Sequence, residues 1–368
     1  MRSDLSRKIW FSTIFIIGMG LAALYSASYQ NVRVPPQIFY DQLLCAFVGV
    51  LIAYFLGRVD YRKFYDAAYV FYGINVVLLL VVLVSGRHAM GARRWMEIGG
   101  FSFQPSELTK LSLIFMLGRY YSHRRPALSF SLLTKAQVIG REIIFPFFLT
   151  VILMLLIFKQ PDLGTALLLF GMFVVMLFAS GTDFRYIVGF LGLCLCLVPF
   201  GWHYLRPYQK DRLLVFLNPN IDPLGAGYTI IQSKIAIGSG RIFGKGWLSG
   251  TQNQLNFLPE RHTDFIFSVI GEEWGLLGAL LLIYFYFMLV RCGLTIADQV
   301  KDKFGMLVTI GIVSILTLQV IINIGMVMGL FPIVGLTLPF ISYGRTSLLI
   351  FMIMVGFLLN LSKKRSAF

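Results

Sequence analysis

Long apolar runs separated by short polar segments are the most regular feature of the sequence. Each run has about the length that a transmembrane helix requires, roughly 20 residues. This pattern predicts an all-α, polytopic integral membrane protein of about ten helices, a single membrane domain over 1–368 with a long extracytoplasmic loop at 202–263. The predicted spans are 10–28, 38–56, 67–84, 105–120, 143–158, 163–180, 185–201, 265–290, 304–330 and 340–361.

The composition favours the same class of protein. The chain is 57% hydrophobic and only 13% charged, whereas soluble proteins carry about 25% charged residues. A net charge of +15 also occurs in nucleic-acid-binding proteins, but in a membrane protein lysines and arginines flank cytoplasmic helix ends and contact anionic lipid. We therefore expect membrane lipid as a partner and no nucleic acid. The cysteines lie in apolar runs without disulfide or metal-site spacing: Cys45, Cys194, Cys196 and Cys292.

Basic residues are distributed unevenly between the two sides of the predicted helices. If the N-terminus is cytoplasmic, most lysines and arginines of the short loops fall on the cytoplasmic side, as the positive-inside rule requires. Both termini are then cytoplasmic, and 202–263 lies outside. This outer loop is itself basic, which suits a phosphate-bearing ligand or, alternatively, lipid headgroups. Its basic residues are Arg206, Lys210, Arg212, Lys234, Arg241, Lys245 and Arg261.

The outer loop contains a second pattern, over 224–246. Tyr228, Ile231, Ile235 and Ile237 are spaced like the apolar face of an amphipathic helix at a membrane interface. The glycines that follow allow tight turns and close approach of the backbone to a ligand. They lack the spacing of a Walker phosphate-binding loop, which excludes that motif.

The candidate catalytic residue is Asp264, at the point where the outer loop re-enters an apolar run. Arg261 and His262 come directly before it. A carboxylate at such a boundary is costly unless it is paired, hydrated or used in a reaction. The alternative is a structural role, in which Thr263 or Asp264 caps the first turn of a helix.

Further charges lie inside or beside the predicted spans. Glu107 and Lys110 are three residues apart and share one helical face, as a functional pair or as an ion pair that fixes helix packing. Asp162 lies in a short outer turn, where an N-cap is the alternative. Several charges expected on the outer side suggest a cavity that is open to the outer leaflet and binds an amphipathic anion. Besides Glu107, Lys110 and Asp162, the charged residues expected on the outer side are Arg93, Arg94, Asp264 and Arg345.

These motifs together resemble the SEDS family (shape, elongation, division and sporulation). The Lys-Gly-Trp form at 245–247 and the Pro-Glu-Arg-His-Thr-Asp form at 259–264 are similar to its RodA-like branch rather than its FtsW-like branch. Where the family usually has a second glycine, this chain has Arg345. The resemblance extends over nearly the whole chain, and its most specific blocks are 94–110, 160–165, 225–228, 232–240, 244–247, 250–252, 258–265 and 323–344.

The resemblance implies a peptidoglycan glycosyltransferase of the bacterial cytoplasmic (inner) membrane. Such a protein polymerises lipid II, an undecaprenyl-pyrophosphate-linked disaccharide pentapeptide, into glycan strands during cell elongation and so maintains rod shape. Its expected partners are a class B penicillin-binding transpeptidase and other membrane proteins of the elongation machinery.

The resemblance also assigns Asp264 as the essential carboxylate and general base for the C4 hydroxyl of the acceptor sugar. No second carboxylate is suitably paired for a double displacement, so we expect single-step inversion. Pyrophosphate and carboxylates also suit a divalent cation such as Mg²⁺ or Mn²⁺, although no dedicated metal motif is present. The expected substrate-binding residues are Arg93, Arg94, Glu107, Lys110, Asp162, Lys245, Arg261, His262, Ser342 and Arg345.

Two other functions are compatible with the same pattern. A lipid II flippase would use the cavity to move its ligand between leaflets, but it needs charges throughout the membrane depth. A scaffold without chemistry would recruit the transpeptidase through its spans. Flipping in sealed vesicles would indicate the first, and tolerance of neutral substitutions at Asp264 and Glu107 the second.

Overall fold

The computed structural model describes residues 2–29, 36–89, 92–123, 139–222 and 225–363. Each of the ten predicted spans coincides with a helix. Within this part of the chain, eight helices are long and apolar enough to cross a membrane. The other two are a 17-residue apolar helix and a helix that carries Glu107, Lys110 and Arg119. The all-α, multi-pass architecture is therefore confirmed.

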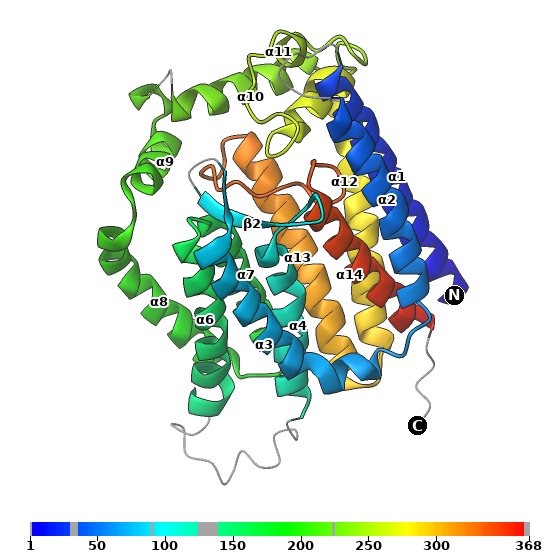
Figure 1. Ribbon diagram of the computed structural model, residues 1–368, viewed down its shortest axis with the longest axis vertical. Coiled ribbons are helices and arrows are strands. Elements are labelled where there is room, and N and C mark those ends of the chain that lie inside the picture. Colours follow the sequence, from blue (N-terminus) through cyan, green and yellow to red (C-terminus); the bar gives the residue numbers. More distant parts are fainter. Residues whose placement is uncertain (1, 30–35, 90–91, 124–138, 223–224, 364–368) are drawn as a thin grey trace.

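The helices that match the predicted spans form one bundle (Figure 1). Seven come from residues 2–204, and the last three close the bundle. Their bounds are α1 (Arg2–Ser28), α2 (Gln37–Leu56), α3 (Arg62–Ser85), α4 (Pro105–Ser122), the π-helical turn η2 (Gly140–Ile144) continuing into α6 (Phe145–Lys159), α7 (Leu163–Ala179), α8 (Phe184–Tyr204), α12 (Ile266–Gln299), α13 (Lys303–Val327) and α14 (Arg345–Lys363).

Burial separates a central group of helices from a peripheral one. In the most apolar window of α14, 83% of the residues are buried, against 6% in α8. α14 packs against α2, α1, α4, α12 and α13, whereas α8 leans away from the bundle beside α7 (Figure 1). Apolar side chains on α8 therefore face the surroundings, as expected for a helix in contact with lipid.

The first turn of α1 and the last turn of α14 lie at the same end of the bundle. The hydroxyls of Ser6 and Ser362 are 2.8 Å apart, and α10 (Ala226–Gly240) and α11 (Thr251–Gln254) lie at the opposite end (Figure 1). We call the end that carries α10 and α11 the upper end. The predicted long loop is partly helical, since it also contains α9 (Pro207–Leu217) and the 3₁₀ turn η3 (Pro219–Ile221).

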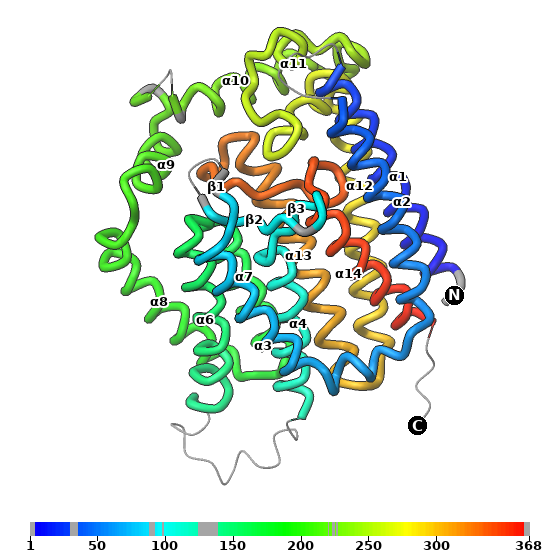
Figure 2. Tube along the Cα trace, viewed as in Figure 1, coloured from blue at the N-terminus to red at the C-terminus, as the bar shows by residue number. Residues whose placement is uncertain are grey.

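A small antiparallel sheet, which the sequence analysis did not predict, lies at the upper end (Figure 2). Its strands are β1 (Arg87–Ala89), β2 (Ala92–Ile98) and β3 (Phe101–Phe103), in the order β1-β2-β3. Gly99 and Gly100 both have positive φ, 57° and 81°, which is the requirement of a tight two-residue hairpin turn. The sheet contacts α3, α4 and α14 and places Arg94 close to the upper end of the bundle.

α10 forms where the interfacial helix was predicted. It packs on α12 through a face of small residues that includes Ser233 and Ala236, both buried. Ile235 stays 45% exposed on the other side. A side chain on Gly240 would overlap the carbonyl oxygen of Gly271, so this glycine allows the two backbones to touch.

The eighth predicted span, 265–290, is longer than expected and is broken. α12 runs from Ile266 to Gln299 and is interrupted at Gly275, which has φ 65° and ψ −160°. Residues 241–246, here called the inserted loop, supply the missing backbone partners. Lys245 N and Gly246 N each donate a 3.0 Å hydrogen bond, to Glu272 O and Glu273 O respectively.

The other side of the break is completed in the same way. Leu276 N donates to Arg241 O at 2.9 Å, and Leu277 N donates to Ile242 O at 3.1 Å. In an unbroken helix these amides would serve the carbonyls of residues 272 and 273. The inserted loop thus replaces both helical bonds, because unpaired backbone groups in a membrane environment cost several kcal/mol each.

We expect Gly275→Ala to destabilise the protein strongly. Its φ and ψ are accessible essentially to glycine alone, at a strain of about 1–3 kcal/mol for other residues, and a Cβ there would overlap Gly244 N. The midpoint of thermal unfolding in detergent should fall. Gly192→Ala on α8 is the matched control, since nothing lies within 4 Å of its Cβ position; an equal effect of both would contradict the structural role of the break.

Candidate functional site

Asp264 lies at the upper end, directly before α12. Its backbone carbonyl accepts a 2.9 Å hydrogen bond from Asn323 Nδ2 of α13, which also donates to Leu336 O at 2.6 Å. Gly335 lies against the carboxylate, since a Cβ on it would be 3.5 Å from Asp264 Oδ2. The side chain of one α13 residue therefore joins the loop before α12 to the segment between α13 and α14.

Ser342 fixes the same two segments to each other. Its hydroxyl donates to Thr263 O at 2.6 Å and accepts from Leu338 N at 2.7 Å, and the residue is buried, with 4% exposed. Next to it, Tyr343 N donates to His262 O at 2.8 Å. The hydroxyl of Ser342, which was predicted to bind substrate, is thus engaged in positioning the backbone before Asp264.

The Asp264 side chain is partly buried and accepts no hydrogen bond from any residue that the structure describes. Burial raises its pKa from 3.8 to about 6, and the nearby carboxylates of Glu260 and Asp162 add to this rise. Arg212 and Arg94 act in the opposite direction. A partly buried carboxylate with a pKa of about 6 and no hydrogen-bond donor among the described residues is suited to act as a general base.

Asp162 and Arg94 belong to this electrostatic group but make structural contacts of their own. Asp162 caps α7, because its two carboxylate oxygens accept from Thr165 N at 3.1 Å and Thr165 Oγ1 at 3.0 Å. Arg94 of β2 donates to Gln160 O at 2.9 Å and to Pro161 O. The guanidinium thus holds the turn that carries Asp162 and lies within electrostatic range of Asp264.

Arg212 of α9 is the cation that the site prediction did not include. It is exposed and donates a hydrogen bond to Ile333 O at 3.2 Å. In the sequence analysis it is one of several basic residues of the outer loop. Its position next to Asp264 depends on α9 folding back toward the segment between α13 and α14, which no local pattern indicates.

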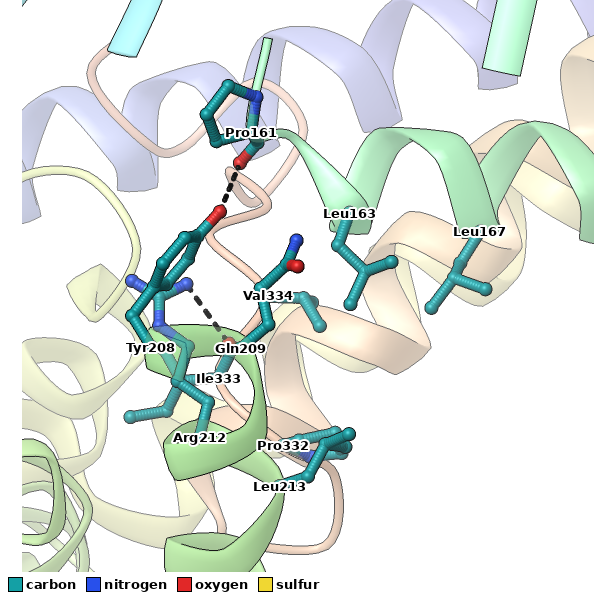
Figure 3. A pocket seen from close by; sticks show the side chains of 10 residues that line it. All are labelled: Pro161, Leu163, Leu167, Tyr208, Gln209, Arg212, Leu213, Pro332, Ile333 and Val334. Carbon is teal, nitrogen blue, oxygen red and sulfur yellow. Dashed lines mark hydrogen bonds between the residues drawn. The ribbon is translucent and has the colours of Figure 1, made fainter. Parts of the chain in front are cut away.

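A groove opens beside Arg212 (Figure 3). Tyr208 stands at its edge and donates to Pro161 O at 3.3 Å. The empty volume of the groove, including the space at its open mouth, is about 430 Å³. The lining is mainly apolar and comes from α7, α9 and the segment before α14: Pro161, Leu163, Leu167, Tyr208, Gln209, Arg212, Leu213, Pro332, Ile333 and Val334. Val334 lines the groove, and the next residue in the chain, Gly335, lies against the carboxylate of Asp264.

Glu107 and Lys110 form a buried ion pair in the first turns of α4. Lys110 Nζ is 2.8 Å from Glu107 Oε1 and 2.9 Å from Gln319 Oε1, and Lys110 is completely buried. Gln319 Nε2 donates to Thr337 O at 2.8 Å. Gln319 and Asn323 are one turn apart on α13, so this network supports the same segment, 335–338, that borders Asp264.

The other predicted cations have partners elsewhere. Lys245 Nζ pairs with Glu272 at 2.8 Å, and Arg261 donates to Ala27 O at 3.2 Å and to Asn256 Oδ1 at 2.6 Å. Arg345 lies 3.6 Å from Asp41 of α2 and donates to Ser102 at 3.2 Å. Exposed Arg93 donates to Val84 O at 3.2 Å. Arg94 is a predicted cation that, together with Arg212, lowers the pKa of Asp264.

His262 has a buried Nδ1 without a hydrogen-bond partner among the described residues. Burial lowers its pKa, and the charge of Glu260 partly opposes this change. Its ring centroid is 6.2 Å from that of Tyr343. The imidazole is therefore neutral at neutral pH and sits two residues before Asp264.

The chain is similar to known proteins along most of its length. A model of the cell cycle protein family FtsW/RodA/SpoVE matches residues 7–367. The peptidoglycan glycosyltransferase MrdB of Escherichia coli K12 is 42% identical over 323 residues, 86% of this chain and 84% of the relative. Stage V sporulation protein E of Bacillus subtilis is 37% identical over 357 residues, 95% of each chain.

Solved structures extend the similarity to the fold. A chain of a peptidoglycan synthase complex that coordinates polymerization and crosslinking superimposes with a TM-score of 0.79 at 32% identity, covering 96% of both chains. The rod shape determining protein RodA of Thermus thermophilus gives a TM-score of 0.70 at 28% identity, covering 97% of this chain and 96% of that one.

The fold and the site thus define a multi-pass membrane protein with a partly buried carboxylate near an apolar groove at the upper end of the bundle. The chain belongs to the FtsW/RodA/SpoVE family of cell cycle proteins, the SEDS family. This confirms the resemblance inferred from the sequence motifs.

Proposed function

We propose that Asp264 takes the proton of the acceptor hydroxyl in the glycosyl transfer that this chain catalyses. The chain is a peptidoglycan glycosyltransferase with a role in cell elongation, as its relatives MrdB and RodA are named. The observation that supports Asp264 is its carboxylate, which is partly buried and has a pKa of about 6. A base whose pKa lies near the working pH combines an ionised carboxylate with useful basicity.

The proposed step is a direct displacement. The acceptor oxygen, that of the C4 hydroxyl, bonds to the anomeric carbon of the donor sugar, the bond from that carbon to the pyrophosphate oxygen breaks, and the pyrophosphate leaves with the electron pair. The hydroxyl proton moves to an Asp264 oxygen. The configuration inverts, because Asp264 acts as a base rather than as a nucleophile.

We propose lipid II as the substrate, with its pyrophosphate near Arg94 and Arg212 and its isoprenyl chain in the groove. Two guanidinium groups next to Asp264 can neutralise the charge that develops on the leaving group. The groove wall is apolar where Leu163, Leu167 and Leu213 line it, which suits a hydrocarbon chain.

The described residues do not form a closed metal site. Among them, no group of three or more His, Cys, Asp or Glu side chains is placed to hold a metal ion, and both carboxylate oxygens of Asp162 already bond Thr165. A divalent cation at this site would be held chiefly by pyrophosphate oxygens and water, as Mg²⁺ often is. The proton transfer described above requires only the side chain of Asp264.

We propose the bacterial inner membrane as the location, with both termini cytoplasmic and the upper end outside. The beginning of α1 and the end of α14 lie at one end of the bundle, and the basic short loops favour the cytoplasm for that end. We further propose a class B transpeptidase and other elongation proteins as partners; the similar chain in a peptidoglycan synthase complex supports the first.

Polymerisation of purified lipid II by the purified chain, with and without the transpeptidase, tests this function. Glycan strands that lengthen with time, and that require Asp264, are expected. Lipid II movement across sealed vesicles without polymerisation would favour a flippase. Activity that is absent with and without the partner, together with normal growth of cells carrying a neutral residue at position 264, would favour a scaffold.

The rate should depend on pH through Asp264. Since only the ionised carboxylate accepts a proton, kcat/KM should reach half its maximum near pH 6 and fall about tenfold per pH unit below that. Arg212→Gln removes a charge that lowers the pKa of Asp264, so the midpoint should move to higher pH. Arg185→Gln, an exposed residue at the start of α8, is the control. A rate that falls to half its maximum only near pH 4 would indicate an aspartate with an ordinary pKa of about 3.9 and contradict the assignment.

A further inference from the structure

The ion pair between Lys245 and Glu272 lies at the break in α12. Lys245 Nζ is 2.8 Å from Glu272 Oε1; 28% of the lysine side chain is exposed, against 1% for the glutamate. The two backbones meet at the same place, because Lys245 N donates to Glu272 O at 3.0 Å. The inserted loop is therefore held to α12 by a side-chain pair as well as by its main chain.

Glu272 has more donors than this one lysine. Its carboxylate accepts from Thr251 Oγ1 at 3.1 Å, Gln252 N at 3.0 Å and Asn253 N at 3.3 Å. Glu272 thus joins the inserted loop and the start of α11 to a single point on α12.

Neighbouring contacts attach the same region to α1. Glu273 accepts from Ser26 Oγ and, at 3.2 Å, from Asn253 Nδ2. Arg261 donates to Ala27 O at the end of α1. The chain from the inserted loop to Asp264 is thus tied to α1 and to α12 at several points.

Asp264 and Glu272 flank the same short piece of helix. Residues 266–273 are all buried, so this upper part of α12 has no face free to move against solvent. Asn323 and Ser342 fix its beginning next to Asp264, and Glu272 and the inserted loop fix its end. A shift at one end is passed to the other, because close-packed interiors adjust little.

We propose that Glu272 is a positioning residue for Asp264, with Lys245 as its counter-ion. The pair holds the inserted loop in the break of α12. It thereby fixes the position of the Asp264 carboxylate, which lies at the other end of residues 266–273. This inference rests on the proposed role of Asp264. It assigns Lys245 to the structure around the base and not to the pyrophosphate of the substrate.

The two roles of Lys245 differ in their effect on kinetics. If it holds the loop, Glu272→Gln and Lys245→Met each remove the same interaction. Both should then lower kcat about 10- to 100-fold, the loss expected from a misplacement of about 1 Å, with KM changed less than about twofold. The double variant should be no slower than the slower single variant, because the two side chains act as one unit. Lys245→Arg keeps the charge and should restore most of kcat.

A second measurement does not depend on activity. Hydrogen exchange of the purified variants should be faster over 241–254 and 266–277 in Glu272→Gln and Lys245→Met, and the amides of Leu276 and Leu277 should lose protection. Asp4→Asn, which breaks the exposed 2.7 Å pair with Lys8 on α1, is the control and should change neither kcat nor exchange in these ranges.

Three outcomes would overturn the proposal. In the first, the losses of kcat in Glu272→Gln and Lys245→Met multiply in the double variant. In the second, Lys245→Met raises KM and leaves kcat unchanged. In the third, hydrogen exchange is faster in both variants while kcat per folded molecule is unchanged. Failure of the proposed function would look different: Asp264→Asn would then retain activity, whatever the exchange pattern of the Glu272 and Lys245 variants.

Discussion

Asp264→Asn should lower polymerisation of lipid II by about 10²–10⁴-fold while the protein folds and inserts normally. A positioned base contributes a factor of this size, and an amide cannot accept the proton. The fold does not depend on the carboxylate, because Asn323 binds the backbone carbonyl of Asp264 and the side chain accepts no hydrogen bond from the described residues. The initial rate of glycan strand formation, at equal amounts of monodisperse protein, measures the effect.

Asp183→Asn is the matched control for this change. Asp183 Oδ1 accepts from Arg185 N at 2.9 Å at the start of α8, and asparagine caps helices about as well as aspartate. Its activity should stay close to that of the unmodified protein. Near-normal polymerisation by Asp264→Asn would remove Asp264 from the mechanism, and a loss of folded protein would give it a structural role instead.

Lys110→Met should destabilise the bundle by about 3–5 kcal/mol, the usual effect of removing one partner of a buried ion pair. It would leave the buried Glu107 without its counter-ion. The cost is larger because Glu107 Oε2 already lacks a hydrogen-bond partner among the described residues. The substitution would also remove the donor to Gln319 Oε1. Thermal unfolding in detergent measures the loss, and activity should fall because segment 335–338 borders Asp264.

A double variant separates the ion pair from substrate binding. Glu107→Gln combined with Lys110→Met removes both charges and should recover much of the stability. Lys63→Met, an exposed residue near the start of α3, is the control and should unfold like the unmodified protein. Normal stability of Lys110→Met with a raised KM for lipid II would instead place Lys110 at the pyrophosphate.

Local contacts in the site follow from spacing along the chain. Glu107 and Lys110 pair because residues three apart share a helical face. Asp162 caps α7 because it lies three residues before Thr165, at the start of an apolar run. For both, the structure shows the alternative that the sequence analysis had kept open, an ion pair and a cap, and it also places them next to the segments around Asp264.

Long-range contacts in the site had no such signal. Lys245 and Arg261 carry the same charge as Arg212 and lie in the same predicted loop. They nevertheless bond Glu272 and α1, whereas Arg212 lowers the pKa of Asp264. Which cation faces the carboxylate is decided by how α9, α10 and the inserted loop fold over the bundle. Charge and chain position alone could not distinguish the three.

The sequence by itself determined the membrane class, the number and approximate limits of the spans, the family and the candidate base. An apolar run of about 20 residues has essentially one stable form in a bilayer, a spanning helix whose backbone groups bond internally. Only the tertiary structure decided the hairpin before α4, the break at Gly275 and the partners of each cation. These features depend on contacts between segments far apart in the chain, and hydrophobic periodicity does not predict such contacts.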